Sequence, residues 1–439
     1  MQIITDLQLH SRFSRAVSPQ MTLSNIAMWA RRKGIGLVAT GDWTHPMWFR
    51  EIETNLEELG NGLLKLKNGD LTPLFLLATE VSCIYSQGGK GRRVHTLIWV
   101  PTIDSARKIS QEMTKRGCNL MSDGRPIIGL TSIQVAELVF GIEPKALVIP
   151  AHAYTPWFSV YGSMSGFDSI EEAFGPYAKQ IYAVETGLSS NPSMNWLIKE
   201  LDNRSIVSFS DAHSGPKLGR EATVFDLKEL SYQSIYDAIK QDGPSKIAYT
   251  IEFYPEEGKY HWSGHRVCKI RWSPEESKKN GTSCPVCGKT LTQGVEQRVG
   301  ELAGRSEESL KLIKKGMLVQ SKAFPNRPPF VMLVPLLEII AEAIGSPVTS
   351  PKVQTLYFRL TDEVASEFDT LMRTDFDVIS KIAGNRVADG IKRVRSGMLH
   401  IDPGYDGVFG VVSLWEHDKL GIVDSGKEQL SLLTPINPD

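Results

Sequence analysis

Histidine and acidic residues recur in this sequence directly after short apolar runs. Seven such runs have the length and the β-branched or aromatic content of buried strands: 3–4, 35–39, 74–78, 96–100, 146–150, 181–184 and 206–209. Side chains able to bind metal follow six of the seven: Gln8, His10, Asp42, His45, Glu80, His152, Glu185, Asp211 and His213. His95 is the exception, because it begins the fourth run. Placement that recurs so regularly predicts a common site, whereas an isolated polar residue after a strand predicts little.

Amphipathic stretches separate the apolar runs and indicate helices. Residues 21–33 carry Leu23, Ile26, Ala27 and Ala30 at helical spacing, and Gly34 is a stop signal. Alternating strands and helices predict an α/β fold, and we expect a seven-stranded βα barrel of parallel strands. Because the carboxyl ends of parallel barrel strands meet on one face, the side chains that follow them would converge there.

The predicted site has the composition of a metal centre. Imidazole nitrogens and carboxylate oxygens suit Zn, Mn or Fe ions, and the set exceeds what one ion can use. We therefore expect two or three divalent ions (Zn, Mn, Mg or Fe), an arrangement that favours hydrolysis of phosphate esters. Asp6 is set back from the other residues, and it could equally be a group that holds His10.

A second metal site is predicted from the cysteines. His265-Arg-Val-Cys268 and Cys284-Pro-Val-Cys287-Gly are two closely spaced pairs, the arrangement of a zinc ribbon with His in place of one Cys. We predict one structural zinc ion on these four residues, with His261 as the alternative to His265. Cys83 and Cys118 stand alone and are interpreted as small core residues.

Composition changes along the chain and suggests three domains. We predict the barrel at 1–248, the zinc-binding ribbon at 249–296 and a mainly helical domain that grips DNA at 297–439. Helical patterns cover 309–315, 334–343, 362–372 and 376–397. The longest apolar run, 330–344, is interrupted by Glu338 and Glu342 and falls short of the ~20 residues of a membrane span.

Charge and cysteine usage narrow the class of protein further. The formal net charge of -1 excludes a globally basic nucleic-acid coat, so contact with a polyanion requires a local patch. Five cysteines are too few for a disulfide framework, and the sequence opens without a signal-peptide pattern. We expect a cytoplasmic protein that does not bind membranes.

Basic and aromatic residues near the predicted site are candidate DNA contacts. We predict that Arg12 and Arg15, just past His10, and the loop residues Lys90, Arg92 and Arg93 bind the backbone. The alternative is that each basic cluster is simply a solvated face, and the same alternative applies to the clusters at 31–33, 311–315 and 386–395. Four aromatic residues that follow site positions could stack a displaced base or could be ordinary packing: Trp43, Trp48, Trp157 and Phe158.

The motifs together resemble those of the PHP superfamily (polymerase and histidinol phosphatase). They are Asp6-Leu-Gln-Leu-His10, Thr40-Gly-Asp-Trp-Thr-His-Pro46, Glu80, His95, His152, Glu185 and Ser210-Asp-Ala-His213. The resemblance implies a seven-stranded barrel with a trinuclear centre for phosphoester hydrolysis. By the family pattern, Glu80 would bridge two ions, His95 and His152 would serve one, and Asp211 another. His213 with Asp42 or His45 would serve a third.

The same resemblance implies that Asp42, Glu80, Asp211 and His213 are the residues on which catalysis depends most. One position departs from the pattern, because the family opens with His-x-His and this chain has Gln8 in the first place. An amide oxygen is a feeble ligand, so the ion at that position would be weakly held or of another kind.

The order of segments resembles the endonuclease Q family over nearly the whole chain. The barrel motifs are followed by Tyr260-His-Trp-Ser-Gly-His-Arg266, the cysteine ribbon, Arg327-Pro-Pro-Phe330 and Pro403-Gly-Tyr-Asp-Gly-Val-Phe-Gly410. The resemblance implies a DNA-repair endonuclease that nicks 5′ to a deaminated base (uracil, hypoxanthine, xanthine) or an abasic site. DNA is the expected partner, and the sequence does not identify repair or replication-clamp partners.

Two alternatives remain open at this point. The first is another phosphoesterase on the same barrel, either an exonuclease or a small-molecule phosphatase. The second is a non-catalytic DNA-binding protein with a decayed metal site, for which Gln8 is the support.

Overall fold

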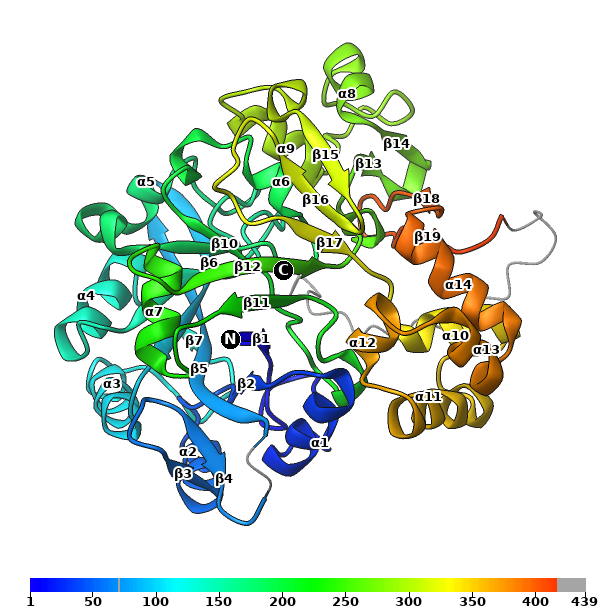
Figure 1. The fold of residues 1–439 in the computed structure, drawn as a ribbon. Coiled ribbons are helices and arrows are strands. Elements are labelled where there is room, and N and C mark those ends of the chain that lie inside the picture. Colours follow the sequence, from blue (N-terminus) through cyan, green and yellow to red (C-terminus); the bar gives the residue numbers. More distant parts are fainter. Residues whose placement is uncertain (70–71, 417–439) are drawn as a thin grey trace.

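A large central sheet runs through the molecule (Figure 1). The structure is a computed structural model that describes residues 1–69 and 72–416. Within these residues thirteen strands join one sheet: β1 (Gln2–Asp6), β2 (Leu37–Ala39), β3 (Leu56–Glu58), β4 (Leu64–Leu66), β5 (Leu74–Gln87), β6 (Lys90–Val100), β7 (Ile127–Ile128), β8 (Leu147–Pro150), β11 (Ala222–Asp226), β12 (Lys246–Glu252), β15 (Leu312–Lys315), β16 (Leu318–Ser321) and β17 (Phe330–Met332). The expected mixed α/β fold is confirmed, and closure into a seven-stranded barrel stays a prediction.

All seven apolar runs form strands. Five belong to the central sheet, and the last two, β9 (Ala183–Glu185) and β10 (Ser205–Val207), pair with each other in parallel. Strands β1, β2 and β5 are parallel neighbours, and β11 pairs antiparallel with β1. The carboxyl ends of β1, β2, β9 and β10 each lead directly into site residues.

The expectation that all seven strands are parallel is wrong for β6. Strand β5 continues past Glu80 to Gln87 and turns back through Gly88 and Gly89, which adopt φ values of 62° and 75°. A two-residue turn can join only antiparallel strands, so β6 runs against β5 and also against β8. The reversal explains His95. Because β6 runs the other way, the start of its apolar run lies beside Ser82 of β5, near Glu80.

Helix α1 (Leu23–Lys33) follows the sequence prediction closely. The side chain of Thr22 caps its start by accepting a hydrogen bond from the backbone N–H of Asn25, and Gly34 ends it with φ 87°. The apolar residues at helical spacing are buried, so this face packs on the sheet.

Further helices surround the sheet in Figure 1: α2 (Pro46–Asn55), α3 (Ile103–Lys115), α4 (Ser132–Ile142), α5 (Ile170–Phe174), α6 (Pro192–Asn195), α7 (Tyr232–Lys240) and α9 (Val295–Leu302). A separate group of helices packs together to one side of the sheet: α10 (Leu336–Ile344), α11 (Pro351–Glu363), α12 (Glu367–Met372), α13 (Phe376–Ala383) and α14 (Asn385–Ser396). Within the described ranges, no helix combines the length and the apolar character that a membrane crossing would require.

The segment expected to be mainly helical also contributes strands. Residues 309–315 do not form the predicted helix, because a short 3₁₀ turn at Glu307–Leu310 leads into β15. Strands β15 to β17 extend the central sheet, since β17 pairs in parallel with β12. The pattern at 362–372 is likewise divided between α11 and α12. The boundaries 1–248, 249–296 and 297–439 stay predictions; β12 spans residue 248, and residues 417–439 lie outside the described part.

Candidate metal centre

Two groups of metal-capable side chains lie where the strand ends meet. The first comprises His10, Asp211 and His213, and the second comprises Glu80, His95 and His152. Within each group the potential ligand atoms lie within 4.8 Å of one another. The sequence prediction that these residues converge is therefore matched by their placement.

Glu80 belongs to the second group and also reaches the first. Its Oε2 is 3.2 Å from His10 Nε2, and its Oε1 is 2.6 Å from His95 Nδ1 and 3.5 Å from His152 Nε2. Each carboxylate oxygen thus faces a different histidine group. This is the geometry expected of a carboxylate that bridges two ions.

Several buried polar atoms at these positions have close neighbours at most but no hydrogen bond of suitable geometry: His10 Nε2, Glu80 Oε1, Glu185 Oε1, Asp211 Oδ1 and His213 Nε2. Buried acceptors left unpaired are costly, and they are rare in stable proteins. His10 Nε2 lies 3.1 Å from Asp211 Oδ1 as well as facing Glu80, so potential ligand atoms of three residues meet in one region. A divalent cation would satisfy them together, and the donor set fits Zn, Mn or Fe.

The electrostatics of Glu185 suit a site that binds cations. The side chain is fully buried, and burial raises the pKa of its carboxyl well above the ordinary range. The nearby charges of Asp211 and Glu80 raise that pKa further. Glu185 Oε2 accepts a hydrogen bond from the backbone N–H of His152 at 2.8 Å, and Oε1 makes no hydrogen bond within the described residues. Positive charge among these carboxylates would relieve their mutual repulsion.

Asp42 is placed differently from the other predicted ligands. Its Oδ1 lies 2.9 Å from His10 Nδ1, and its Oδ2 accepts from the N–H and hydroxyl of Ser11 and from the hydroxyl of Ser14. Both oxygens are thus occupied within the protein. This arrangement orients the imidazole of His10 so that Nε2 faces Glu80, the usual role of a carboxylate behind a metal-bound histidine.

Three other predicted residues border the two groups. Gln8 donates its Nε2 to Glu80 Oε2 at 2.9 Å, so in this arrangement it holds Glu80. His45 stacks on Phe13 with ring centroids 4.6 Å apart, and its buried Nδ1 has no partner. Asp6 does not touch His10. It accepts hydrogen bonds from Ser210 and from the Gly219 N–H instead, and burial raises its pKa to about 6.

Sequence reasoning missed Arg125, whose Nη1 lies 3.5 Å from Glu80 Oε1. Its side chain is 16% exposed, and it comes from an irregular segment just before β7. A single arginine outside any apolar or helical pattern gives no signal in the sequence, and only the pairing of β7 with β5 brings it to the site.

The five candidate DNA contacts differ in their exposure to solvent. Arg12 and Arg15 lie at the surface and pair with Glu51 and Asp123, and Lys90 and Arg93 are exposed on the β5–β6 hairpin. Arg92 is buried instead. Its guanidinium pairs with Glu172 and lies over the ring of Phe167, 4.0 Å from the centroid, so it is engaged inside the protein.

The four candidate stacking residues also differ in their exposure to solvent. Trp43 and Trp48 are fully buried, so they pack in the core and cannot stack a base. Trp157 is partly exposed and meets Tyr260 edge to face at 5.5 Å. The ring of Phe158 lies 4.9 Å from that of His95, at the border of the second group.

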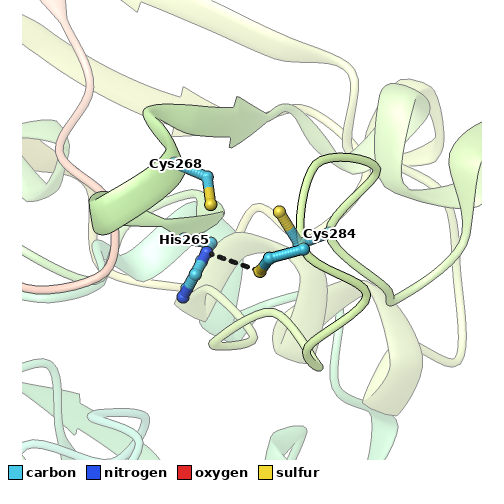
Figure 2. Close-up of side chains that lie close together, drawn as sticks. His265, Cys268 and Cys284 are labelled. Atoms are coloured by element: carbon cyan, nitrogen blue, oxygen red, sulfur yellow. Dashed lines mark hydrogen bonds between the residues drawn. The ribbon is translucent and has the colours of Figure 1, made fainter.

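The cysteine cluster assembles as the spacing predicts. Figure 2 shows His265, Cys268 and Cys284 directed toward a common point, and Cys287 Sγ lies 3.5 Å from His265 Nδ1. The short strands β13 (Ser263–His265) and β14 (Ile270–Trp272) and helix α8 (Pro274–Asn280) surround these residues. Although burial opposes it, backbone N–H groups of Cys287 and Val286 lower the pKa of Cys284 to about 6.

The structure places His265 rather than His261 among the cysteines. His261 is buried elsewhere, with its Nε2 3.5 Å from Glu296 Oε2. One imidazole and three thiols within 4.8 Å match the ligand set of a structural zinc site.

The chain is similar to several known proteins. Residues 335–398 match a family model described as the MJ0043 C-terminal domain. The chain is 34% identical over 269 residues to an uncharacterized protein, MJ0043, of Methanocaldococcus jannaschii. The match covers 60% of this chain and 31% of that protein, so the chain spans about a third of the length of that relative.

Two solved structures are similar over nearly the whole chain. One is the lesion-specific endonuclease PfuEndoQ from Pyrococcus furiosus, with 32% identity, a TM-score of 0.80 and coverage of 94% of this chain and 95% of that one. The other is an endonuclease Q in complex with a 27-mer duplex substrate that has an abasic lesion at the active site. Its identity is 33%, its TM-score is 0.80, and the match covers 95% of this chain and 97% of that one.

Proposed function

Because the chain belongs to the endonuclease Q family and is a metal-dependent nuclease, we propose that it nicks damaged DNA. The proposed substrate is a strand with a deaminated base (uracil, hypoxanthine or xanthine) or an abasic site, and the bond cut is the phosphodiester 5′ to the lesion. The observation that carries the proposal is the full-length similarity to a lesion-specific endonuclease, together with two histidine–carboxylate groups joined by Glu80.

The residues that would hold the ions are the members of the two histidine–carboxylate groups, together with Glu185. His10, Asp211 and His213 would bind on one side of Glu80, and His95 and His152 on the other, with Glu185 beside them. Divalent ions in such a site supply Lewis acidity and make hydroxide available at neutral pH. Asp42 fixes the tautomer and the direction of His10, and Gln8 fixes Glu80.

The proposed reaction is hydrolysis with in-line geometry. The oxygen of a water molecule attacks phosphorus and loses its proton to solvent or a neighbouring base. The bond between phosphorus and the 3′ oxygen breaks, and that oxygen takes up a proton. The products are a 3′ hydroxyl and a 5′ phosphate on the lesion side. The buried side chains around the groups exclude bulk water, which strengthens electrostatic contacts with the phosphate.

Lesion choice follows from the chemistry of deamination. Loss of an exocyclic amino group leaves a carbonyl on both cytosine and adenine, so a fixed N–H donor would accept the products. The same donor would reject the parent bases, because two opposed N–H groups cost about 1–3 kcal/mol or more. The base would leave the stack to reach such a pocket, most easily at a weakened pair.

The proposed DNA track uses the exposed cations near the site. Arg12 and Arg15 lie beside the segment that carries His10, and Lys90 and Arg93 lie on the hairpin that carries His95. We propose these four as backbone contacts and leave out Arg92, whose guanidinium is occupied by Glu172. The zinc ion on His265, Cys268, Cys284 and Cys287 would stabilise the ribbon, and the protein would act in the cytoplasm.

A cleavage panel tests the proposed function. Duplexes with one uracil, one hypoxanthine, one xanthine or one abasic site, and an undamaged control, are incubated with the protein and Mg or Mn. We expect a single nick 5′ to each lesion and none in the control, and Asp211→Asn protein should leave every strand intact. Intact lesion strands with folded, metal-loaded wild-type protein would refute the proposal.

The same panel separates the two alternatives. An exonuclease would shorten strands from their ends regardless of the lesion, and a small-molecule phosphatase would leave all duplexes intact but hydrolyse a phosphate monoester. A protein with a decayed site would bind DNA, hold zinc only in the ribbon and cut nothing.

A further inference from the structure

Arg125 lies in the candidate metal centre, but the proposed ligand set gives this cationic side chain no role. Its guanidinium Nη1 lies 3.5 Å from Glu80 Oε1, the oxygen that also faces His95 and His152. Burial lowers the pKa of Arg125, but the carboxylates of Glu80 and Asp211 raise it above the ordinary value. A permanent positive charge therefore stands beside the residues that would bind cations.

The backbone around Arg125 is fixed on both sides of the residue. Asp123 Oδ1 accepts from the N–H of Arg125 at 3.1 Å, and Pro126 O accepts from the N–H of Ser82 at 3.0 Å. At Gly124 a Cβ would lie 2.4 Å from Asp42 Oδ2, so the chain passes too close to the site for any side chain there. This tight approach holds the guanidinium above Glu80.

A role as a plain counterion of Glu80 does not explain this placement. Glu80 would be a ligand of the divalent ions, and positive charge held at its carboxylate would repel a guanidinium 3.5 Å away. Within the described residues, Glu80 is the only acid that pairs directly with Arg125. The charges of Asp211, Asp123 and Asp42 also act on Arg125, but the anion that the proposed reaction brings to this point is the phosphodiester.

We propose that Arg125 is a catalytic residue that donates hydrogen bonds to a non-bridging oxygen of the scissile phosphate. A planar guanidinium suits this task, because it offers two parallel N–H donors to one phosphate and keeps its charge at any working pH. The inference rests on the proposed function, since it names the group that binds the substrate of that same site. Arg125 contacts the phosphate as charge builds on its oxygens, which favours the transition state.

The test is a double-mutant cycle between the side chain and the phosphate charge. Two lesion duplexes are prepared that are not cleaved at the scissile position. One carries a 3′-methylene phosphonate, which keeps the negative charge but has no bond from phosphorus to a 3′ oxygen. The other carries a neutral methylphosphonate. Affinities of metal-loaded wild-type protein, Arg125→Ala and the control Arg116→Ala are measured by fluorescence anisotropy, and metal content is measured on the same samples.

We expect wild-type protein to prefer the charged duplex, and Arg125→Ala to reduce that preference about 10- to 100-fold with metal content unchanged, the range of a charge-assisted hydrogen bond. Arg116 lies exposed just after α3 and pairs with Glu112, so Arg116→Ala should keep the wild-type preference. Arg125→Lys, which keeps the charge but loses the planar fork, should recover part of it.

Two results would overturn the inference. The first is an equal preference in wild-type and Arg125→Ala protein, and the second is loss of metal from Arg125→Ala, which would mean that the residue only holds Glu80. Wild-type protein that neither binds the charged duplex nor nicks a natural lesion strand would instead refute the proposed function itself. The two failures are therefore distinguishable.

Discussion

A pair of buried carboxyl groups beneath the site makes stability depend on pH. Glu221 and Glu252 are both fully buried. Glu252 Oε1 accepts from Ser208 Oγ at 2.6 Å and from Thr250 Oγ1, whereas its Oε2 has no partner. Burial raises the pKa of Glu252 from 4.5 to about 7, and burial together with the neighbouring Glu252 raises that of Glu221 well above 4.5. Both groups therefore favour the protonated form in the folded protein.

The direction of the pH effect follows from proton binding. Below about pH 4.5 Glu252 is protonated in both the folded and the unfolded chain, so its full contribution to stability is present. As the pH rises toward 7, the unfolded chain loses the proton first, and the free energy of unfolding falls. At about 1.4 kcal/mol per pH unit, the displacement from 4.5 to about 7 corresponds to a loss of about 3 kcal/mol.

The substitution Glu252→Gln removes this titration while keeping the shape of the side chain. We expect the variant to be more stable than wild type at pH 8.5, by about 1–3 kcal/mol, and to lose that advantage progressively toward pH 5. The assay is differential scanning calorimetry of both proteins between pH 5 and pH 8.5, with the exposed Glu171→Gln variant as control. A difference in Tm between Glu252→Gln and wild type that stays constant with pH would refute the reasoning, as would a wild type that is the more stable protein at pH 8.5.

Three further predictions concern the metal centre, the ribbon and the helical group. Glu80→Gln should release the ions of the metal centre but not the ribbon zinc, and it should lower the cleavage rate by about 100-fold or more, because one residue serves both ligand groups. Elemental analysis that finds full occupancy would contradict the bridging role. Cys284→Ser should release one zinc ion per chain and lower Tm while the other metals stay bound, and unchanged zinc content would contradict the ribbon site. Lys33→Met should cost about 3–5 kcal/mol, because it leaves Glu367 buried without the cation that lies 2.7 Å away; a denaturation midpoint equal to that of wild type would contradict this.

The convergence of the candidate metal ligands could be predicted from the sequence, because most of these residues follow strands. Apolar runs predict strands, and a histidine or carboxylate directly after a run lies at the edge of the sheet formed by the carboxyl ends of the strands. His10, Glu185 and Asp211 were found by this rule, and the structure places them together. His95 precedes its apolar run instead of following it, and it reaches the same edge because β6 runs antiparallel to its neighbours. The reversal of β6 depends on the two-glycine turn after Gln87, a local signal that outweighs the general preference for parallel strands.

Features that depend on tertiary contacts could not be predicted from the sequence. Nothing in the pattern around Asp42 indicates that Ser11 and Ser14 occupy one of its oxygens. Arg125 reaches the centre only through the pairing of β7 with β5, which spans a long separation along the chain. The apolar spacing at 309–315 fits a helix or a strand equally, and pairing with β16 decides for the strand.

The most direct test of the account uses a covalently closed circular DNA that carries one abasic site. Metal-loaded protein should convert it to a nicked circle, with the single break at the phosphodiester 5′ to the lesion, and EDTA should abolish the reaction. An undamaged circle should stay closed. An abasic circle that stays closed while linear DNA is degraded from its ends would contradict the account, because a lesion-directed endonuclease needs no free terminus.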